Sequence, residues 1–84
     1  MQTQLEKANR MKQAHQNEID FLREMERADR AEAEGYLAAL RFLPDGAPAA
    51  MRHDIATHAD DAFSRADYAK RAARRAEERL ARMQ

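Results

Sequence analysis

The sequence contains no cysteine and no tryptophan, and it has only two glycines and two prolines among its 84 residues. The absence of cysteine excludes disulfide bonds, thiolate metal ligands and a cysteine nucleophile. Long apolar runs are absent as well, whereas a membrane-spanning helix needs about 20 mostly apolar residues. We therefore expect a soluble, cytoplasmic protein that does not associate with membranes.

Charged side chains make up 36% of the residues, and the 15 basic and 15 acidic groups cancel. A chain without net charge has no global field that draws it to nucleic acid or to an anionic membrane. The hydrophobic share of 44% contains many alanines, which bury little area. A chain of this length buries a small core, so we expect one domain over residues 1–84 that is stabilised by oligomerisation or by a partner.

The clearest break in the chain is the segment LPDGAP, Leu43–Pro48, which holds three of the four glycines and prolines. Proline and glycine in this arrangement end one helix, form a turn and start the next helix. The segment Thr3-Gln4-Leu5-Glu6 fits a capping box, which predicts that Thr3 caps the first helix. We predict helices over about 4–42 and 48–83 and a turn over 43–47: an all-α hairpin of two long antiparallel helices.

The second helix carries an unbroken heptad pattern, with apolar residues at alternating spacings of four and three. Its members are Ile55, Ala59, Ala62, Ala66, Ala69, Ala73, Ala76, Leu80 and Met83. Such a pattern is typical of a coiled-coil seam. Because six of the nine positions hold alanine, it predicts that the facing helix approaches closely.

The first helix supplies larger residues for the other side of this seam. They are Leu5, Ala8, His15, Ile19, Leu22, Met25, Ala33, Tyr36, Leu40 and Leu43. The steps through Leu22, Met25, Asp29 and Ala33 cover eleven residues, which predicts a local unwinding of the left-handed coil. Folding at the turn brings together residues whose numbers sum to about 92.

Gly35 lies inside the first helix, where glycine costs about 1 kcal/mol relative to alanine. We expect the second helix to come close at this point, which would favour a residue without a side chain. The alternative is a kink that leaves a short third helix over Tyr36 to Phe42.

Five large apolar residues lie off the seam and predict an interface with a second copy or another protein. They are Phe21, Phe42, Met51, Phe63 and Tyr68. A two-helix hairpin leaves a second apolar stripe uncovered, and burying one phenylalanine contributes roughly 1.5 to 3 kcal/mol. We therefore expect a homodimer with a four-helix arrangement, with a different protein partner or a splayed trimer of helices as the alternatives.

Charge is segregated along the chain although the total is zero. Residues 18–34 carry seven acidic and three basic side chains, a net charge of −4, and residues 65–84 carry the reverse, a net charge of +4. The basic face of the second helix consists of Arg71, Arg74, Arg75, Arg79 and Arg82. It either pairs with the acidic block of the first helix or binds a partner, which includes the phosphates of RNA or DNA.

The stretch THADDAF, Thr57–Phe63, resembles part of the second helix of Rop, a plasmid RNA-binding hairpin that dimerises into a four-helix bundle. The resemblance covers few residues of the chain, and it implies an RNA-binding alternative without assigning contact residues. Asp54, His58 and Asp61 share one helical face and form the strongest candidate for a metal site. We expect this face to be a solvated surface and predict neither a metal nor a cofactor.

Motifs of catalysis are missing, since there is no glycine-rich phosphate loop and Ser64, the single serine, has no evident base. We expect a non-enzymatic protein-binding module, a small adaptor or inhibitor that engages or occludes a larger protein. In size and composition the chain resembles small inhibitory proteins of bacteriophages, including those of the anti-CRISPR type. A secretion or assembly chaperone is a further alternative.

Overall fold

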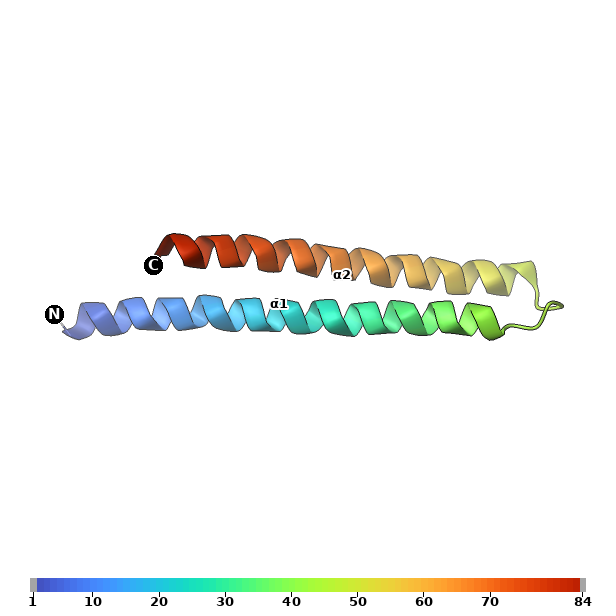
Figure 1. The fold of residues 1–84 in the computed structure, drawn as a ribbon, viewed down its shortest axis with the longest axis horizontal. Helices are drawn as coiled ribbons and strands as arrows, with labels where there is room; N and C mark the ends of the chain where they lie inside the picture. The colour runs from blue at the N-terminus through green and yellow to red at the C-terminus, as the bar shows by residue number, and fades with distance from the viewer. Residues whose placement is uncertain (1, 84) are drawn as a thin grey trace.

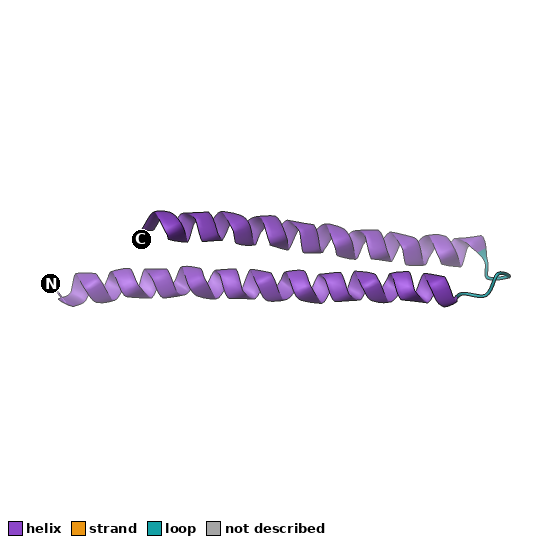
Figure 2. Cartoon of the chain, in the orientation of Figure 1, coloured by secondary structure: helices purple, strands orange, loops and turns teal. Residues whose placement is uncertain are grey.

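The computed structural model describes residues 2–83, which form two helices joined by a short turn. Helix α1 spans Gln2–Phe42 and helix α2 spans Ala49–Met83. They lie side by side in opposite directions, as Figure 1 shows, and form a rod of 71 × 14 × 14 Å measured on Cα atoms. Figure 2 shows no strand among the described residues, so the predicted all-α antiparallel hairpin is confirmed.

The turn is held by hydrogen bonds from both of its ends. The N–H of Ala47 donates to the carbonyl oxygen of Pro44 at 2.9 Å, which closes a turn around Asp45 and Gly46. The Arg52 guanidinium also donates to that carbonyl and ties the turn to the first turn of α2. No glycine among the described residues has a positive φ, so this turn uses a backbone conformation that other residues also adopt.

The alanine seam of α2 is buried against α1 as predicted. Its six alanines are all at most 1% exposed, and Ile55, Leu80 and Met83 at its ends are half-buried. Among the described side chains of α1, only Ile19 and Ala33 are buried, at 6% and 0% exposure. Seven of the eight buried residues are therefore alanine, and the core of the hairpin is thin.

The predicted change of phase in α1 is wrong, because its seam keeps a strict heptad pattern. Glu26 takes the position between Leu22 and Asp29, its side chain is only 16% exposed, and Met25 points outward. The half-buried and buried residues of this seam are Lys12, His15, Ile19, Leu22, Glu26, Asp29, Ala33, Tyr36, Leu40 and Leu43. The helix therefore has no eleven-residue step and no local unwinding is required.

The N-terminal part of α1 differs from the prediction in two ways. The helix begins at Gln2, so Thr3 lies within it and does not cap it. Residues 3–11 are exposed, and this segment extends beyond the C-terminal end of α2 in Figure 1. Leu5 and Ala8, which were predicted to lie on the seam, are therefore in solvent.

Neither expectation for Gly35 holds. Helix α1 continues through this position to Phe42 without forming a separate third helix. A methyl group built at Gly35 would meet no atom within 4 Å, so α2 does not approach closely there. Packing inside the hairpin gives no reason for a glycine at this position.

Candidate functional site

The five apolar residues predicted at an interface all remain exposed. Phe42, Tyr68 and Phe21 are the most accessible, at 87%, 67% and 65%, whereas Met51 and Phe63 are exposed by less than half. They do not form one surface, because the helical positions of their side chains differ. Phe63 lies on one face of the hairpin, and the other four lie on the opposite face.

Phe21 and Phe42 belong to a second heptad stripe of α1, which we call the outer stripe. It runs beside the seam at the same alternating spacings of three and four residues. Its members are Met11, Ala14, Glu18, Phe21, Met25, Ala28, Glu32, Gly35, Ala39 and Phe42. All ten are exposed, so α1 presents a largely apolar surface along most of its length. The sequence pattern for this stripe was present, but the predicted phase change placed Met25 on the seam and concealed it.

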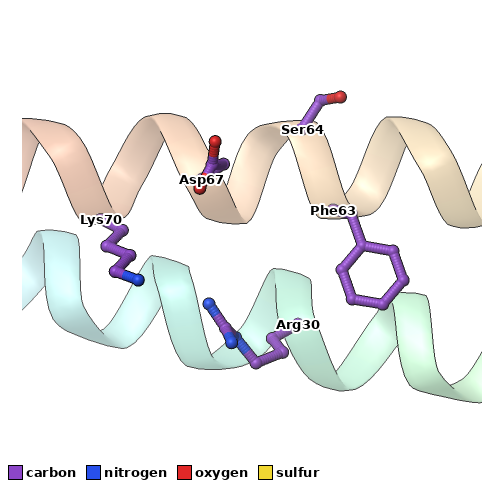
Figure 3. Close-up of a pocket in the computed structure, with 5 residues that line it drawn as sticks. All are labelled: Arg30, Phe63, Ser64, Asp67 and Lys70. Atoms are coloured by element: carbon purple, nitrogen blue, oxygen red, sulfur yellow. The ribbon is translucent and has the colours of Figure 1, made fainter.

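Phe63 lies on the other face of the hairpin. Together with Arg30, Asp67 and Lys70 it lines a shallow groove between the helices, in which the ring projects toward α1 (Figure 3). The groove is mixed in character, with an aromatic ring beside cationic and anionic groups. Phe63 is thus partly covered by its own chain and is a weaker interface candidate than Phe21 or Phe42.

The basic face of α2 is divided between paired and unpaired arginines. Arg79 reaches Glu18 of α1 at 3.4 Å, which is the single contact of these five residues with the acidic block. Arg71 pairs with Asp67, and Arg82 approaches Glu78 at 4.0 Å within α2.

Arg74 and Arg75 form no ion pair within residues 2–83. The basic face is therefore only partly neutralised by its own chain.

The hydrogen bond from Arg71 changes the pKa of Asp67. The guanidinium lowers the pKa of the Asp67 carboxyl below its ordinary value, because it stabilises the carboxylate. Both side chains are mainly in solvent, at 70% and 52% exposure, so the pair contributes little to folding. Its effect is to reduce the positive charge that Arg71 presents to a partner.

Other ion pairs join the two helices and hold them in register. Arg65 pairs with Glu32 at 2.9 Å and with Asp29 at 3.4 Å. Arg23 donates from Nε to Glu77 at 3.0 Å, and this carboxylate raises the pKa of the guanidinium. Within residues 2–83, the four ion pairs between the helices join residues whose numbers sum to between 94 and 100, somewhat above the predicted sum of about 92.

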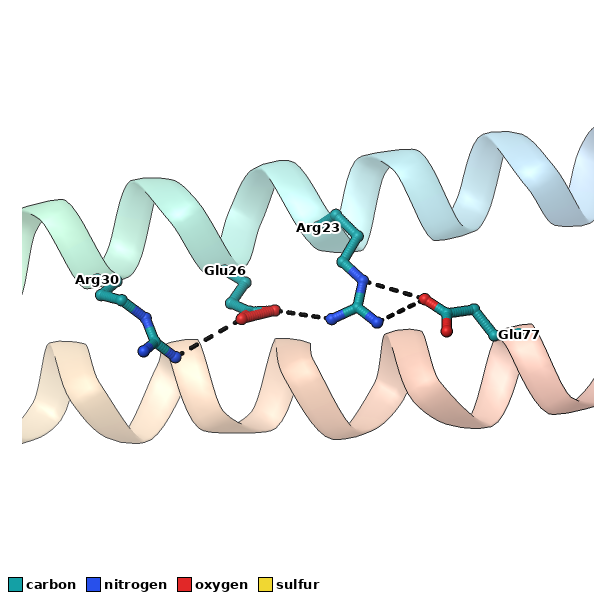
Figure 4. A network of polar contacts seen from close by, with 4 residues as sticks. All are labelled: Arg23, Glu26, Arg30 and Glu77. Atoms are coloured by element: carbon teal, nitrogen blue, oxygen red, sulfur yellow. Dashed lines mark hydrogen bonds and ion pairs between the residues drawn. The ribbon is translucent and has the colours of Figure 1, made fainter.

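A chain of alternating charges crosses the hairpin near its middle, as Figure 4 shows. Glu26 lies between Arg23 at 3.0 Å and Arg30 at 3.6 Å, and Arg23 continues to Glu77 of α2. This network explains how a glutamate occupies a seam position, because its carboxylate is satisfied by two guanidiniums. The sequence prediction missed it because it assigned the more hydrophobic Met25 to the seam position that Glu26 takes.

His58 faces α1 rather than the two aspartates that share its sequence pattern. Its ring stacks on Tyr36 with centroids 5.4 Å apart and planes inclined by 25°. Across residues 2–83, no three His, Asp or Glu side chains are arranged to hold a metal ion. The row Asp54, His58 and Asp61 thus does not form a metal cluster.

These observations define the class of the protein as an all-α antiparallel helical hairpin with a coiled-coil seam of alanine. No protein-family model matches the chain, and no curated protein or solved structure matches it either. Neither helix has, over residues 2–83, a stretch long and apolar enough to cross a membrane.

Proposed function

We propose that this chain is a non-enzymatic protein-binding module, a small helical adaptor or inhibitor that works as a homodimer and engages a larger protein. The observation that carries this proposal is the distribution of apolar residues. The buried side chains are almost all alanine, whereas larger apolar residues lie outside: Met11, Phe21, Met25, Phe42, Met51, Phe63 and Tyr68. Association is the process that removes such side chains from water.

The energetic argument follows from the size of these side chains. Covering one large apolar residue contributes roughly 1.5 to 3 kcal/mol, while a buried alanine methyl contributes about 0.8 kcal/mol. The two exposed phenylalanines of the outer stripe are therefore comparable with several seam alanines. A hairpin of this kind gains much of its stability when another helix covers it.

The larger partner is expected to present an acidic surface to α2. Arg71 and Arg74 lie one turn apart on the side of α2 that faces away from α1, and both are exposed. Arginine is enriched at protein interfaces, where its guanidinium pairs with carboxylates of the partner.

Affinity capture from the native lysate tests this proposal, with nuclease added to one half of the sample. The variant Arg71→Glu/Arg74→Glu should lose one specific protein and keep its helical circular dichroism spectrum. Lys7→Glu/Arg10→Glu is the matched control, because it reverses two exposed charges on the N-terminal segment of α1, away from Arg71 and Arg74. Capture of the same proteins by all three forms would argue against binding through this face.

The second candidate function is RNA or DNA binding by a Rop-like hairpin, with the arginines of α2 on the phosphates. It is favoured by Arg74 and Arg75, which form no ion pair among the described residues. Binding of this type weakens steeply as salt rises. A gel-shift titration at low and high salt separates it from the first proposal, since a protein partner survives nuclease treatment and a nucleic-acid partner does not. A chaperone role would instead require several clients in the capture experiment.

A further inference from the structure

The exposed face that holds the outer stripe also holds a second regular row, on α2. This row, which we call the charge row, contains every seventh residue of α2. In chain order its residues are acidic, acidic, aromatic, basic and basic. Its members are Asp54, Asp61, Tyr68, Arg75 and Arg82, and all five are exposed. A row with this order is complementary to itself when a second copy runs in the opposite direction.

The two rows lie on the same face of the hairpin. Glu18 and Glu32 belong to the outer stripe, and they pair with Arg79 and Arg65 of α2. Residues three or four positions apart are neighbours on a helix, so Arg65 lies beside Tyr68 and Arg79 lies beside Arg75 and Arg82. A partner that lies on the outer stripe therefore also meets the charge row.

The centres of the two rows lie close together along the rod. The outer stripe, from Met11 to Phe42, is centred between Glu26 and Arg27, and the charge row is centred on Tyr68. The ion pairs Asp29–Arg65 and Arg23–Glu77 place the segment 23–29 of α1 beside the segment 65–77 of α2. Both centres fall within these segments, so one two-fold axis relates both rows to their copies.

We propose that a second copy of the chain covers this face, antiparallel and face to face, with α1 on α1 and α2 on α2. Asp61 then meets Arg75 of the second copy, and Asp54 meets Arg82. The two Tyr68 rings meet at the axis. This inference rests on the proposed association and names its partner, its direction and its register.

The outer stripe is self-complementary in size under the same operation. Met25 lies opposite Ala28 of the second copy, and Met11 lies opposite Phe42. Gly35 lies opposite Glu18, so the glycine that the hairpin does not need leaves room for a longer side chain. Glu18 and Glu32 carry no unpaired charge into the interface, because arginines of their own chain already neutralise them.

The surface that this arrangement covers matches what a stable dimer requires. The outer stripe is about 47 Å long and the charge row about 42 Å, and a helix is about 10 Å wide. The combined length of the two rows, multiplied by the width of a helix, gives roughly 900 Å² per copy. An interface of standard size covers about 800 Å² per partner. Arg71 and Arg74 remain outside the interface and free for a different protein.

Reversal of single charges tests the register. In Asp61→Arg, two arginines face each other on both sides of the two-fold axis, and in Arg75→Asp two aspartates do so. We expect each single variant to weaken dimerisation about tenfold or more. The double variant Asp61→Arg/Arg75→Asp restores both opposite-charge contacts and has the composition and net charge of the original chain.

The measurement is sedimentation velocity of purified chains over a concentration series, with circular dichroism as the check on folding. Neither side chain has an ion-pair partner in the described part of its own chain, so both variants should fold. A mixture of the two single variants should form a heterodimer more readily than either variant forms its own dimer. Should one single variant fold poorly, comparison of the double variant with the single variant that folds still tests the register.

Three results would overturn the inference. The original chain could sediment as a monomer at every concentration, or it could form trimers or larger assemblies. Alternatively, it could form a dimer that the single reversals leave unchanged, which would place the interface elsewhere. Each of these is independent of the lysate experiment, because that experiment uses the outward arginines and scores a different protein.

Discussion

The substitution Gly35→Ala should stabilise the hairpin, and the structure allows its size to be worked out. The new methyl group meets no atom within 4 Å, and no glycine in residues 2–83 has a positive φ. Steric cost is therefore absent, and the gain is the difference in helix propensity, about 1 kcal/mol. For a domain of this size, that raises the midpoint of thermal unfolding by about 4 to 8 °C.

The assay is thermal and urea unfolding monitored by circular dichroism. The concentration is low enough for the chain to sediment as a monomer. Ala31→Gly is the reciprocal control, since Ala31 is also exposed on α1 and should lose about the same 1 kcal/mol. A fall in the midpoint for Gly35→Ala, with the expected fall for Ala31→Gly, would refute the reasoning. It would mean that α2 approaches Gly35 or that α1 bends there.

Three further predictions concern the seam and one ion pair. Ala69→Leu should destabilise the hairpin by about 1 to 3 kcal/mol in urea unfolding, because the site is fully buried, whereas the exposed Ala81→Leu should have little effect. Glu26→Leu should raise the urea midpoint by about 1 kcal/mol, since it replaces a half-buried carboxylate with an apolar side chain; a lower midpoint would show that its arginine pairs contribute more. An NMR pH titration should find the pKa of Asp67 below its ordinary value and find it normal in Arg71→Gln. Because the folded pKa is lowered, the pair stabilises the hairpin above the ordinary aspartate pKa, and this contribution is lost as the pH falls through the lowered value; equal titration curves would exclude the pair.

The sequence was sufficient to predict α2 because a strict alanine heptad has one geometric interpretation. It was insufficient for α1, where Met25 and Glu26 compete for one seam position. Hydrophobicity favours Met25, but the carboxylate of Glu26 is satisfied by Arg23 and Arg30, and that compensation is visible only in three dimensions.

The candidate surfaces show the same limit. The exposure of Phe21 and Phe42 and of the arginines was predicted from their positions off the seam. The division of the basic face into paired and unpaired arginines was not predicted. Arg79 pairs with Glu18 because the folded hairpin brings them side by side, while Arg74 has no ion-pair partner among the described residues. Sequence spacing orders residues on one helix, and only the pairing of helices decides which charges are neutralised.

The single turn between the helices also has a kinetic consequence. Moving one residue away from the turn on each helix lengthens the intervening chain by two residues, so the entropy lost in forming a contact grows steadily toward the open end. We therefore expect contacts near Arg52 to form first and those near Leu80 to form last. If the helices separate progressively from the open end, the rate of amide hydrogen exchange should rise along both helices from the turn to the open end.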